Sequence, residues 1–425
     1  MEHFKDTTTI HFAGIMSEPV SVHVEVSLLP TCRITSCNIS SAVTKFLSTS
    51  CYILQPGPVS FSRDDFLNQN LHALRVADFD DCSSNVVFFH QAKFHITSFV
   101  LNTTGGESET LEDDGEDGET PALINWPLPS LHFDGMWEAL IYDQEIKNRL
   151  LRYSETALRF SDAKVNSNYV TWNRVVLLHG PPGSGKTSLC KALAHKLSIV
   201  LKKRYHSSYL VEINAHSLFS RWFSESGKLV LRLFDSIFDM LADSGTFIVV
   251  LIDEVESLSA SRKAALSGSE PSDAIRVVNA LLTQIDRIGK LPNVLITCTT
   301  NITSAVDLAF VDRADLKVYL GPPSVRVIYT LFRQSITSLI ESHLLLPEEL
   351  PLEPENCDSD VGKQLLTASE KAFGFSGRTL RKLPFIAFAF FAKSKDILSV
   401  GSLSEHSRVL LFQNMKIEVC YQIIK

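Results

Sequence analysis

The sequence predicts an α/β fold, in which helices cover both faces of a parallel sheet. We expect a smaller helical lid after this sheet and a small β-rich (α+β) domain before it. Three observations lead to this expectation. The apolar run Val175–Leu178 leads directly into the glycine-rich segment Gly180–Thr187 and then into a helical pattern. Apolar strand patterns alternate with helical patterns along the chain, which is typical of a parallel sheet. After about Gly321 the strand patterns stop and helical patterns dominate.

The chain has 425 residues, enough for about two or three domains. The first part alternates apolar and polar residues in segments such as Val20–Val26, which predicts strands. It contains no recognisable catalytic constellation, so its role is either binding or that of a purely structural cap. Our expected boundaries are 1–100 for this β-rich domain, 101–129 for a linker, 130–320 for the large α/β domain and 321–425 for the small helical lid.

The composition excludes several classes of protein. A net charge of −8 argues against a nucleic-acid-binding surface, which requires clustered Lys and Arg. The first residues lack the order of a signal peptide, and no apolar run approaches the ~20 residues that a membrane span needs. Eight cysteines without a Cys-x-x-Cys pair argue against a disulfide framework or a zinc site and indicate a reducing compartment. The carboxylate-rich run Gly105–Glu119 predicts a flexible acidic linker; a solvated spacer is favoured over a docking strip for a basic partner.

The strands and helices of the larger part follow from the apolar pattern. We expect strands at Arg174–Leu178, Leu210–Ile213, Phe247–Ile252 and Val294–Thr297. We expect lid helices at Val325–Ile340 and Ser376–Ala392. The terminal segment Lys416–Tyr421 alternates like a strand.

The segment after the first of these strands has the chemistry of a phosphate-binding loop. Its glycines let the backbone turn tightly and aim N–H groups at one phosphate, its lysine reaches the β- and γ-phosphates, and its hydroxyl binds Mg²⁺. The following helix adds its N-terminus to the same phosphate. We expect ATP to be bound by Gly180, Pro181, Pro182, Gly183, Ser184, Gly185, Lys186, Thr187 and Ser188, with Thr187 as a ligand of Mg²⁺.

Carboxylates at the end of a later strand indicate hydrolysis. The apolar run Phe247–Ile252 ends in Asp253 and Glu254. Asp253 would join the nucleotide site by holding Mg²⁺, and Glu254 would polarise the water that attacks the γ-phosphate. Asn301, at the end of the next strand, is placed to orient the same water. A core strand with a polar end is the weaker alternative.

Other residues point to the lid and to a partner. Arg378 opens a lid helix, and we expect it to reach the γ-phosphate and couple the nucleotide to the lid. The neighbours Trp222 and Phe223 cannot both face inward on a regular element, so they either grip something or form a partly buried helix start. The aromatic lead-in Phe133–Tyr142 forms one wall of an adenine pocket, or its Trp137 belongs to the core.

Together these motifs resemble those of AAA+ ATPases, in which an aromatic loop such as Trp222-Phe223 lines the central pore of a hexamer. The lid motif Gly377–Pro384, together with Phe133–Tyr142 and Leu308–Asp315, resembles the pachytene-checkpoint family within that group. The resemblance covers nearly all of residues 130–425. It covers the N-terminal part only in size and β character.

The resemblance implies a homohexamer that uses ATP and Mg²⁺ to convert HORMA-domain proteins from a closed to an open state in spindle-checkpoint and meiotic regulation. A comet-type adapter would assist, the N-terminal domain would dock adapter and substrate, and Trp222 would engage the substrate's terminal segment. The implied location is the nucleus and cytoplasm, including chromosomes and kinetochores. Many AAA+ ATPases carry two arginines before the last core strand. The corresponding run here, Asp312–Asp315, contains one arginine, Arg313. Arg313 is therefore the candidate arginine finger, the side chain that would reach the γ-phosphate bound to a neighbouring subunit.

Two competing functions are weighed against features of the sequence. A nucleic-acid motor or clamp-loader-like ATPase is disfavoured by the acidic balance and the lack of a basic stripe. A nucleotide-gated scaffold with little turnover is disfavoured by Glu254 and Asn301. We expect no direct contact with nucleic acid or membranes.

Overall fold

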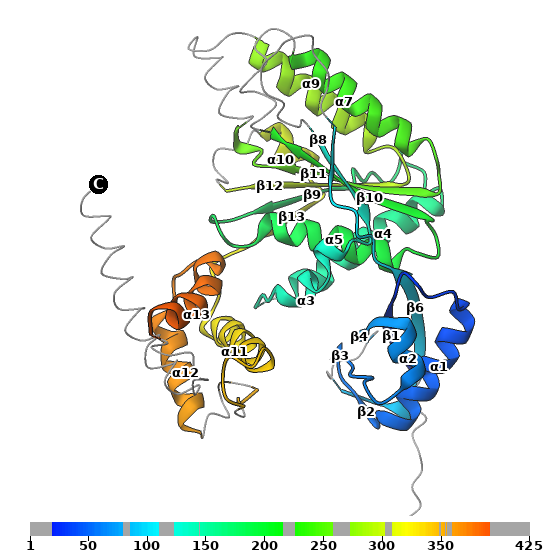
Figure 1. The fold of residues 1–425 in the computed structure, drawn as a ribbon. Helices are drawn as coiled ribbons and strands as arrows, with labels where there is room; N and C mark the ends of the chain where they lie inside the picture. Colours follow the sequence, from blue (N-terminus) through cyan, green and yellow to red (C-terminus); the bar gives the residue numbers. More distant parts are fainter. Residues whose placement is uncertain are drawn as a thin grey trace, which may run out of the picture. The chain divides into compact units, whose positions relative to one another are not determined.

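The computed structural model of the chain describes residues 19–79, 86–109, 123–143, 145–215, 226–257, 273–301, 308–347, 350–352, 354 and 359–391. The chain forms two compact units, Met1–Leu101 and Asn102–Lys425, which Figure 1 shows in colours that follow the sequence. Each unit is built around hydrophobic clusters of its own. Within the described residues, each helix is too short or too polar to cross a membrane.

The first unit is an α+β domain, which confirms the predicted β-rich N-terminal domain. In its main sheet, of order β3-β4-β1-β6, β1 runs antiparallel to β4 and parallel to β6. Alternate residues of β1, namely Val22, Val24 and Val26, are buried with Ile39 and Val43 of α1, as the period of two in a strand requires. The elements are β1 (Val20–Leu28), α1 (Ser36–Ser50), β2 (Ile53–Leu54), β3 (Gly57–Pro58), α2 (Asp65–Asn70), β4 (Leu71–Phe79), β5 (Val87–Phe88), the 3₁₀ turn Phe89–Gln91 and β6 (Ala92–Val100).

The second unit contains the predicted parallel sheet, of order β13-β9-β12-β11-β10-β8-β7. The strands from β13 to β10 are parallel, whereas β8 pairs antiparallel with both β10 and β7. Its strands are β7 (Glu107–Glu109), β8 (Leu123–Leu128), β9 (Val175–His179), β10 (Ser207–Asn214), β11 (Thr246–Asp253), β12 (Val294–Thr300) and β13 (Leu316–Tyr319). Its helices are the 3₁₀ turn Leu131–Phe133, α3 (Met136–Ala139), α4 (Ile146–Asp162), α5 (Lys186–Val200), α7 (Ser226–Leu241), α9 (Asp273–Ile288) and α10 (Leu308–Arg313).

The four predicted strands are present as β9, β10, β11 and β12, but the predicted linker differs from the structure. Residues 107–109 and 123–128 of the expected linker 101–129 are strands of the sheet. The physical reason is that Leu123 and Leu128 are apolar and become buried when β8 pairs with β10. The carboxylate-rich residues between these two strands lie outside the described residues.

The central strands bury both of their faces, as parallel sheets do. On one face, Ile248 and Val250 of β11 pack in the cluster that contains residues of α7 and α9. On the other face, Phe247 and Val249 pack in the cluster that contains residues of α4 and α5. Figure 1 shows these helix pairs on opposite sides of the sheet. The parallel register brings the carboxyl ends of β9, β11 and β12 to one edge of the sheet.

The predicted helical lid is confirmed. It consists of α11 (Val325–Glu341), α12 (Asp360–Lys371) and α13 (Gly377–Phe391), drawn in yellow to orange in Figure 1. Leu380, Leu383 and Ala387 lie on one face of α13 and are buried in the lid core. The strand pattern predicted at Lys416–Tyr421 lies outside the described residues.

Candidate nucleotide site

The loop between β9 and α5 depends on its glycines. Gly180, Gly183 and Gly185 have φ angles of 151°, 77° and 92°, which residues with a side chain rarely adopt. A Cβ atom added to Gly180 would lie 2.1 Å from the carbonyl oxygen of Leu320. The glycines therefore allow the tight turn that brings the start of α5 to the carboxyl edge of the sheet.

Lys186 is the first residue of α5, and only 5% of it is exposed. Its Nζ donates hydrogen bonds of 2.9 Å to the carbonyl oxygens of Gly180 and Pro181, so the ammonium lies against the loop. Burial lowers the pKa of this ammonium, while the carboxylates of Glu256 and Asp253 act in the opposite direction. A partly desolvated cation in this place is stabilised by an anionic ligand.

Thr187 and Asp253 meet at the same edge of the sheet. The Thr187 hydroxyl lies 3.0 Å from each carboxylate oxygen of Asp253, and the Thr299 hydroxyl also donates to Asp253. Hydroxyl and carboxylate oxygens are the hard ligands that Mg²⁺ prefers, and in phosphate sites this ion uses few protein ligands. The described residues hold no cluster of three His, Cys, Asp or Glu that would form a dedicated metal cage. The donor set therefore fits Mg²⁺ shared between the protein and bound phosphates.

Glu254 and Asn301 also lie at this edge. Glu254 is exposed, has a left-handed φ of 58°, and donates its backbone N–H to the Thr299 hydroxyl at 3.2 Å. Such backbone strain clusters at functional sites. The Asn301 side chain is held by Glu256, whose Oε1 accepts from Nδ2 at 2.8 Å and from the Asn301 backbone N–H at 3.1 Å. Glu256 thereby fixes the orientation of the Asn301 amide.

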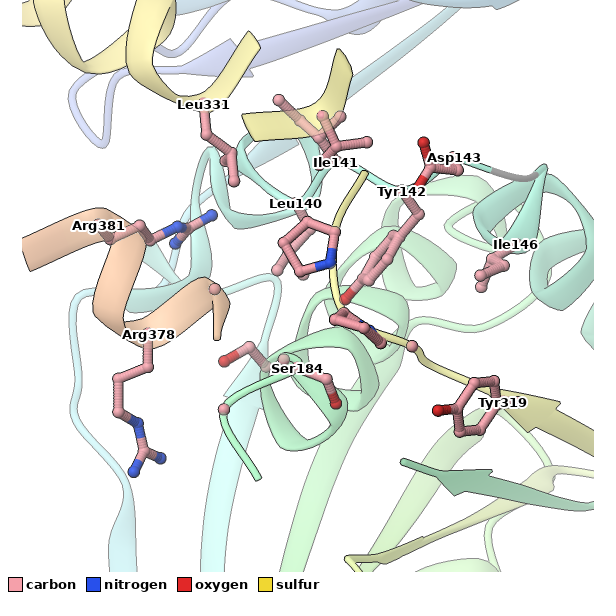
Figure 2. Close-up of a pocket in the computed structure, with 18 of the residues that line it drawn as sticks. Leu140, Ile141, Tyr142, Asp143, Ile146, Ser184, Tyr319, Leu331, Arg378 and Arg381 are labelled. Carbon is pink, nitrogen blue, oxygen red and sulfur yellow. The ribbon is translucent and has the colours of Figure 1, made fainter. Parts of the chain in front are cut away.

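The lid closes over the loop. The backbone N–H of Arg378 donates to the carbonyl oxygen of Gly183 at 3.2 Å, which ties the start of α13 to the loop. A cavity of about 630 Å³ lies beside this contact. Figure 2 shows Arg378 and Arg381 on one side of the cavity, with Leu140, Ile141 and Tyr142 across from them. The cavity joins an apolar wall to the phosphate loop, as a nucleoside requires. Further lining residues include Ser184, Gly185, Ser188, Tyr319, Val327 and Leu331.

Tyr142 is the polar group of the apolar wall. Its hydroxyl oxygen is buried and has no hydrogen-bond partner among the described residues, and burial raises its pKa. A neutral, unpartnered donor that faces a cavity indicates a polar ligand atom there. Trp137 does not line this cavity. It packs against the core, with the Lys147 ammonium 5.3 Å from the centroid of its ring. Trp137 thus belongs to the core, while Leu140, Ile141 and Tyr142 of the lead-in line the cavity; adenine binding at this wall stays a prediction.

The structure places Arg313 away from these groups. It ends α10, next to the edge where the parallel strands begin. Its Nε and Nη2 each bind a different oxygen of Asp286 at 2.7 Å, and Nη1 donates to the Ala309 carbonyl oxygen. Within one chain it does not reach the loop, and its role as a finger for a neighbouring subunit stays a prediction. Trp222 and Phe223 lie outside the described residues.

Sequence reasoning gave no individual role to Glu256, Thr299 or Tyr142, although Tyr142 ends the lead-in Phe133–Tyr142 that was expected to form a wall of the adenine pocket. Thr299 had a usable signal, because it lies at the end of β12, the strand that Asn301 follows. Glu256 had no such signal, because it lies 45 residues before Asn301 in the sequence.

Three family models match the chain. The model described as ATPase family associated with various cellular activities (AAA) matches residues 176–322. The TRIP13 N-terminal domain matches residues 17–104, and the TRIP13-like, AAA+ ATPase lid C-terminal domain matches residues 352–403. The matches cover most of the first unit, the parallel strands of the sheet from Val176 onward, and helices α12 and α13 of the lid.

Known proteins and structures agree with these models. The Pachytene checkpoint protein 2 homolog of Xenopus tropicalis is 47% identical over 391 residues, which cover 89% of this chain and 90% of that protein. The structure of C. elegans PCH-2 has a TM-score of 0.74 and 32% identity, and the match covers 93% of this chain and 99% of that chain. A structure of the E. coli MS115-1 HORMA:CdnC:Trip13 complex has a TM-score of 0.52 and 19% identity, with 67% and 93% covered. At that identity the last likeness shows the fold alone. With the nucleotide-binding fold in place and 47% identity over nearly the whole length, the chain belongs to the pachytene checkpoint protein 2 family of AAA ATPases.

Proposed function

We propose that this AAA ATPase hydrolyses ATP with Mg²⁺ and uses the energy to remodel another protein. The observation that carries the proposal is the meeting of Thr187, Asp253, Glu254 and Asn301 at the carboxyl edge of one sheet, beside the glycine loop. A scaffold that only binds nucleotide needs the loop but has no use for a carboxylate and an amide beside it. The Glu254 carboxylate and the Asn301 amide therefore favour hydrolysis over nucleotide binding without turnover.

Each residue has a role in this proposal. Lys186 and the loop N–H groups hold the phosphates, while Thr187 and Asp253 hold Mg²⁺, which offsets phosphate charge when bound. Glu254 accepts the proton of the attacking water, and Asn301 orients that water. Arg378 senses the γ-phosphate from the lid, because its backbone already contacts Gly183.

The proposed protein substrate is a HORMA-domain protein. Support comes from family membership and from the fold shared with the Trip13 subunit of the E. coli complex, which contains a HORMA protein. The proposed assembly is a homohexamer in which Arg313 of one subunit leaves Asp286 and reaches the next subunit's γ-phosphate. Residues 1–100 would dock the substrate and a comet-type adapter, and Trp222 and Phe223 would grip the substrate in the pore. The proposed location is the nucleus and cytoplasm, including chromosomes and kinetochores.

Stimulation of ATP hydrolysis tests this function. We expect a closed HORMA-domain protein plus a comet-type adapter to raise the hydrolysis rate of the full chain, and double-stranded DNA to leave it unchanged. Trp222→Ala should keep the basal rate but lose conversion of the HORMA protein, measured by the mobility of its two states on an ion-exchange column. Stimulation by DNA alone would instead favour a nucleic-acid motor. Normal conversion by Trp222→Ala would show that this side chain is not the grip.

The contact between Glu256 and Asn301 makes a prediction of its own. Glu256→Ala removes the acceptor that orients the Asn301 amide, so kcat should fall about tenfold, while the Kd for ATP changes less than about threefold. Steady-state phosphate release and binding of a fluorescent ATP analogue measure the two quantities. If Glu256 acts through Asn301, the double variant Glu256→Ala, Asn301→Ala should be no slower than Asn301→Ala alone. Additive losses would contradict this positioning role.

A further inference from the structure

A second cavity, of about 620 Å³, lies at the opposite edge of the large sheet, where the parallel strands begin. It is bounded by the end of α4, the segment that leads into β9, the end of α9 and Arg313. All of these elements belong to the large α/β part of the second unit, and none belongs to the lid. Its size is in the range of small-molecule pockets, about 300 to 1,000 Å³.

Basic side chains dominate the charged part of the lining of this cavity. Lys164, Arg174, Lys290 and Arg313 line it, whereas the only lining carboxylate is that of Asp286. Asp286 already forms a two-pronged ion pair with Arg313. For the other three cations, the described part of the chain holds no carboxylate within ion-pair distance. The cavity therefore carries an excess of positive charge.

Arg174 is the unusual member of this group. Only 5% of it is exposed, yet its guanidinium binds neutral oxygens, those of the Ser161 hydroxyl and the Gly289 carbonyl. Asp315 lies nearby, but its Oδ2 accepts from the backbone N–H of Arg174 rather than from the guanidinium. Burial lowers the pKa of the guanidinium, and the charge of the nearby Asp315 acts in the opposite direction without reaching ion-pair contact. A buried charge without an ionic partner is costly unless a ligand supplies the opposite charge.

The backbone and a neighbouring donor support the same interpretation. Arg174 has a left-handed φ of 59°, a strain that persists only where the surroundings enforce it. The Trp172 ring lies 5.3 Å from the Arg174 guanidinium, and its buried Nε1–H has no acceptor among the described residues. A buried indole N–H normally finds an acceptor. Trp172 and Arg174 thus supply two kinds of donor among the residues that line the cavity.

We propose that this cavity binds the phosphate group of a small molecule, separately from the nucleotide loop. Arginine donates in the fork geometry that matches phosphate oxygens, and the Trp172 N–H adds a neutral donor. Three cations without a carboxylate partner match the roughly −1.5 to −2 charge of a phosphate better than the single charge of a carboxylate. Apolar and aromatic lining residues, Phe160, Val165 and Ile285, leave room for the rest of the molecule.

Titration with inorganic phosphate and pyrophosphate tests the proposal. All titrations use the full-length chain with Lys186→Ala, because this substitution removes binding at the nucleotide loop. We expect saturable binding with one site per chain, measured by calorimetry. Lys164→Ala combined with Lys290→Ala should weaken this binding about tenfold. Both lysines are exposed, so these changes leave the fold intact, which circular dichroism and the melting temperature verify. Trp172→Phe keeps the ring but removes the donor, and should weaken binding severalfold.

The same titration distinguishes a free phosphate compound from the triphosphate held by a second copy of the chain. All lining residues come from one chain, so we expect the binding to persist in a monomeric fraction isolated by size exclusion. Loss of binding in the monomer would assign the anion to a neighbouring subunit and overturn the proposal. Absence of saturable binding, or equal binding by the double lysine variant, would overturn it as well.

Discussion

The Glu254→Gln variant is expected to bind ATP as tightly as the unchanged chain and to hydrolyse it about 100- to 1,000-fold more slowly. The glutamine keeps the size of the side chain but cannot accept a proton from water. The groups that hold the phosphates, among them Lys186 and Thr187, do not contact the Glu254 side chain in the hydrogen bonds of the described residues. Phosphate release gives kcat, and a fluorescent ATP analogue gives the Kd.

A matched control for this variant is Glu370→Gln on the exposed surface of α12, which should leave both quantities unchanged. The variant should also accumulate in an ATP-bound, substrate-bound assembly, because binding survives while water activation is lost. A kcat within about threefold of the unchanged chain would remove Glu254 from the role of general base, since such a base contributes 10²- to 10⁴-fold.

Lys186→Ala is expected to weaken ATP binding about 100-fold, because a charge-assisted contact with phosphate contributes roughly 3 kcal/mol. Without nucleotide, the substitution should leave the stability of the fold unchanged or raise it. The desolvation that lowers the pKa of the buried ammonium opposes the gain from its hydrogen bonds to the Gly180 and Pro181 carbonyl oxygens, so removing the side chain changes the stability of the unliganded fold little. We therefore expect an unchanged or higher melting temperature without nucleotide, and loss of the upward shift that ATP and Mg²⁺ cause in the unchanged chain.

Differential scanning fluorimetry with and without ATP measures both halves of this prediction. Lys202→Ala, at an exposed position just after α5, changes the same charge outside the loop and should keep the full ATP-induced shift. If Lys186→Ala melted far lower without nucleotide but kept the shift, the lysine would be a structural residue of the loop rather than a phosphate ligand.

The sequence alone determined the features that depend on short-range chemistry. The glycines of Gly180–Thr187 can be recognised because a tight phosphate loop needs them at fixed spacing, and the structure gives Gly180, Gly183 and Gly185 the positive φ angles that this implies. The strand before the loop and the carboxylates Asp253 and Glu254 could be predicted because an uninterrupted apolar run marks a buried parallel strand. In the sheet, the order β9-β12-β11 then places the loop after β9 near the carboxylates at the end of β11.

Only the tertiary structure decided which distant residues complete these motifs. Two pairs show this, Glu256 with Asn301 and Arg313 with Asp286, because no local pattern connects their members. The strand β8 could not be predicted from the sequence for the same reason. It follows an acidic run that resembles a linker, and its burial depends on pairing with β10, about 80 residues later. Periodicity and spacing report what a segment does by itself, whereas these contacts depend on how the helices and the sheet pack.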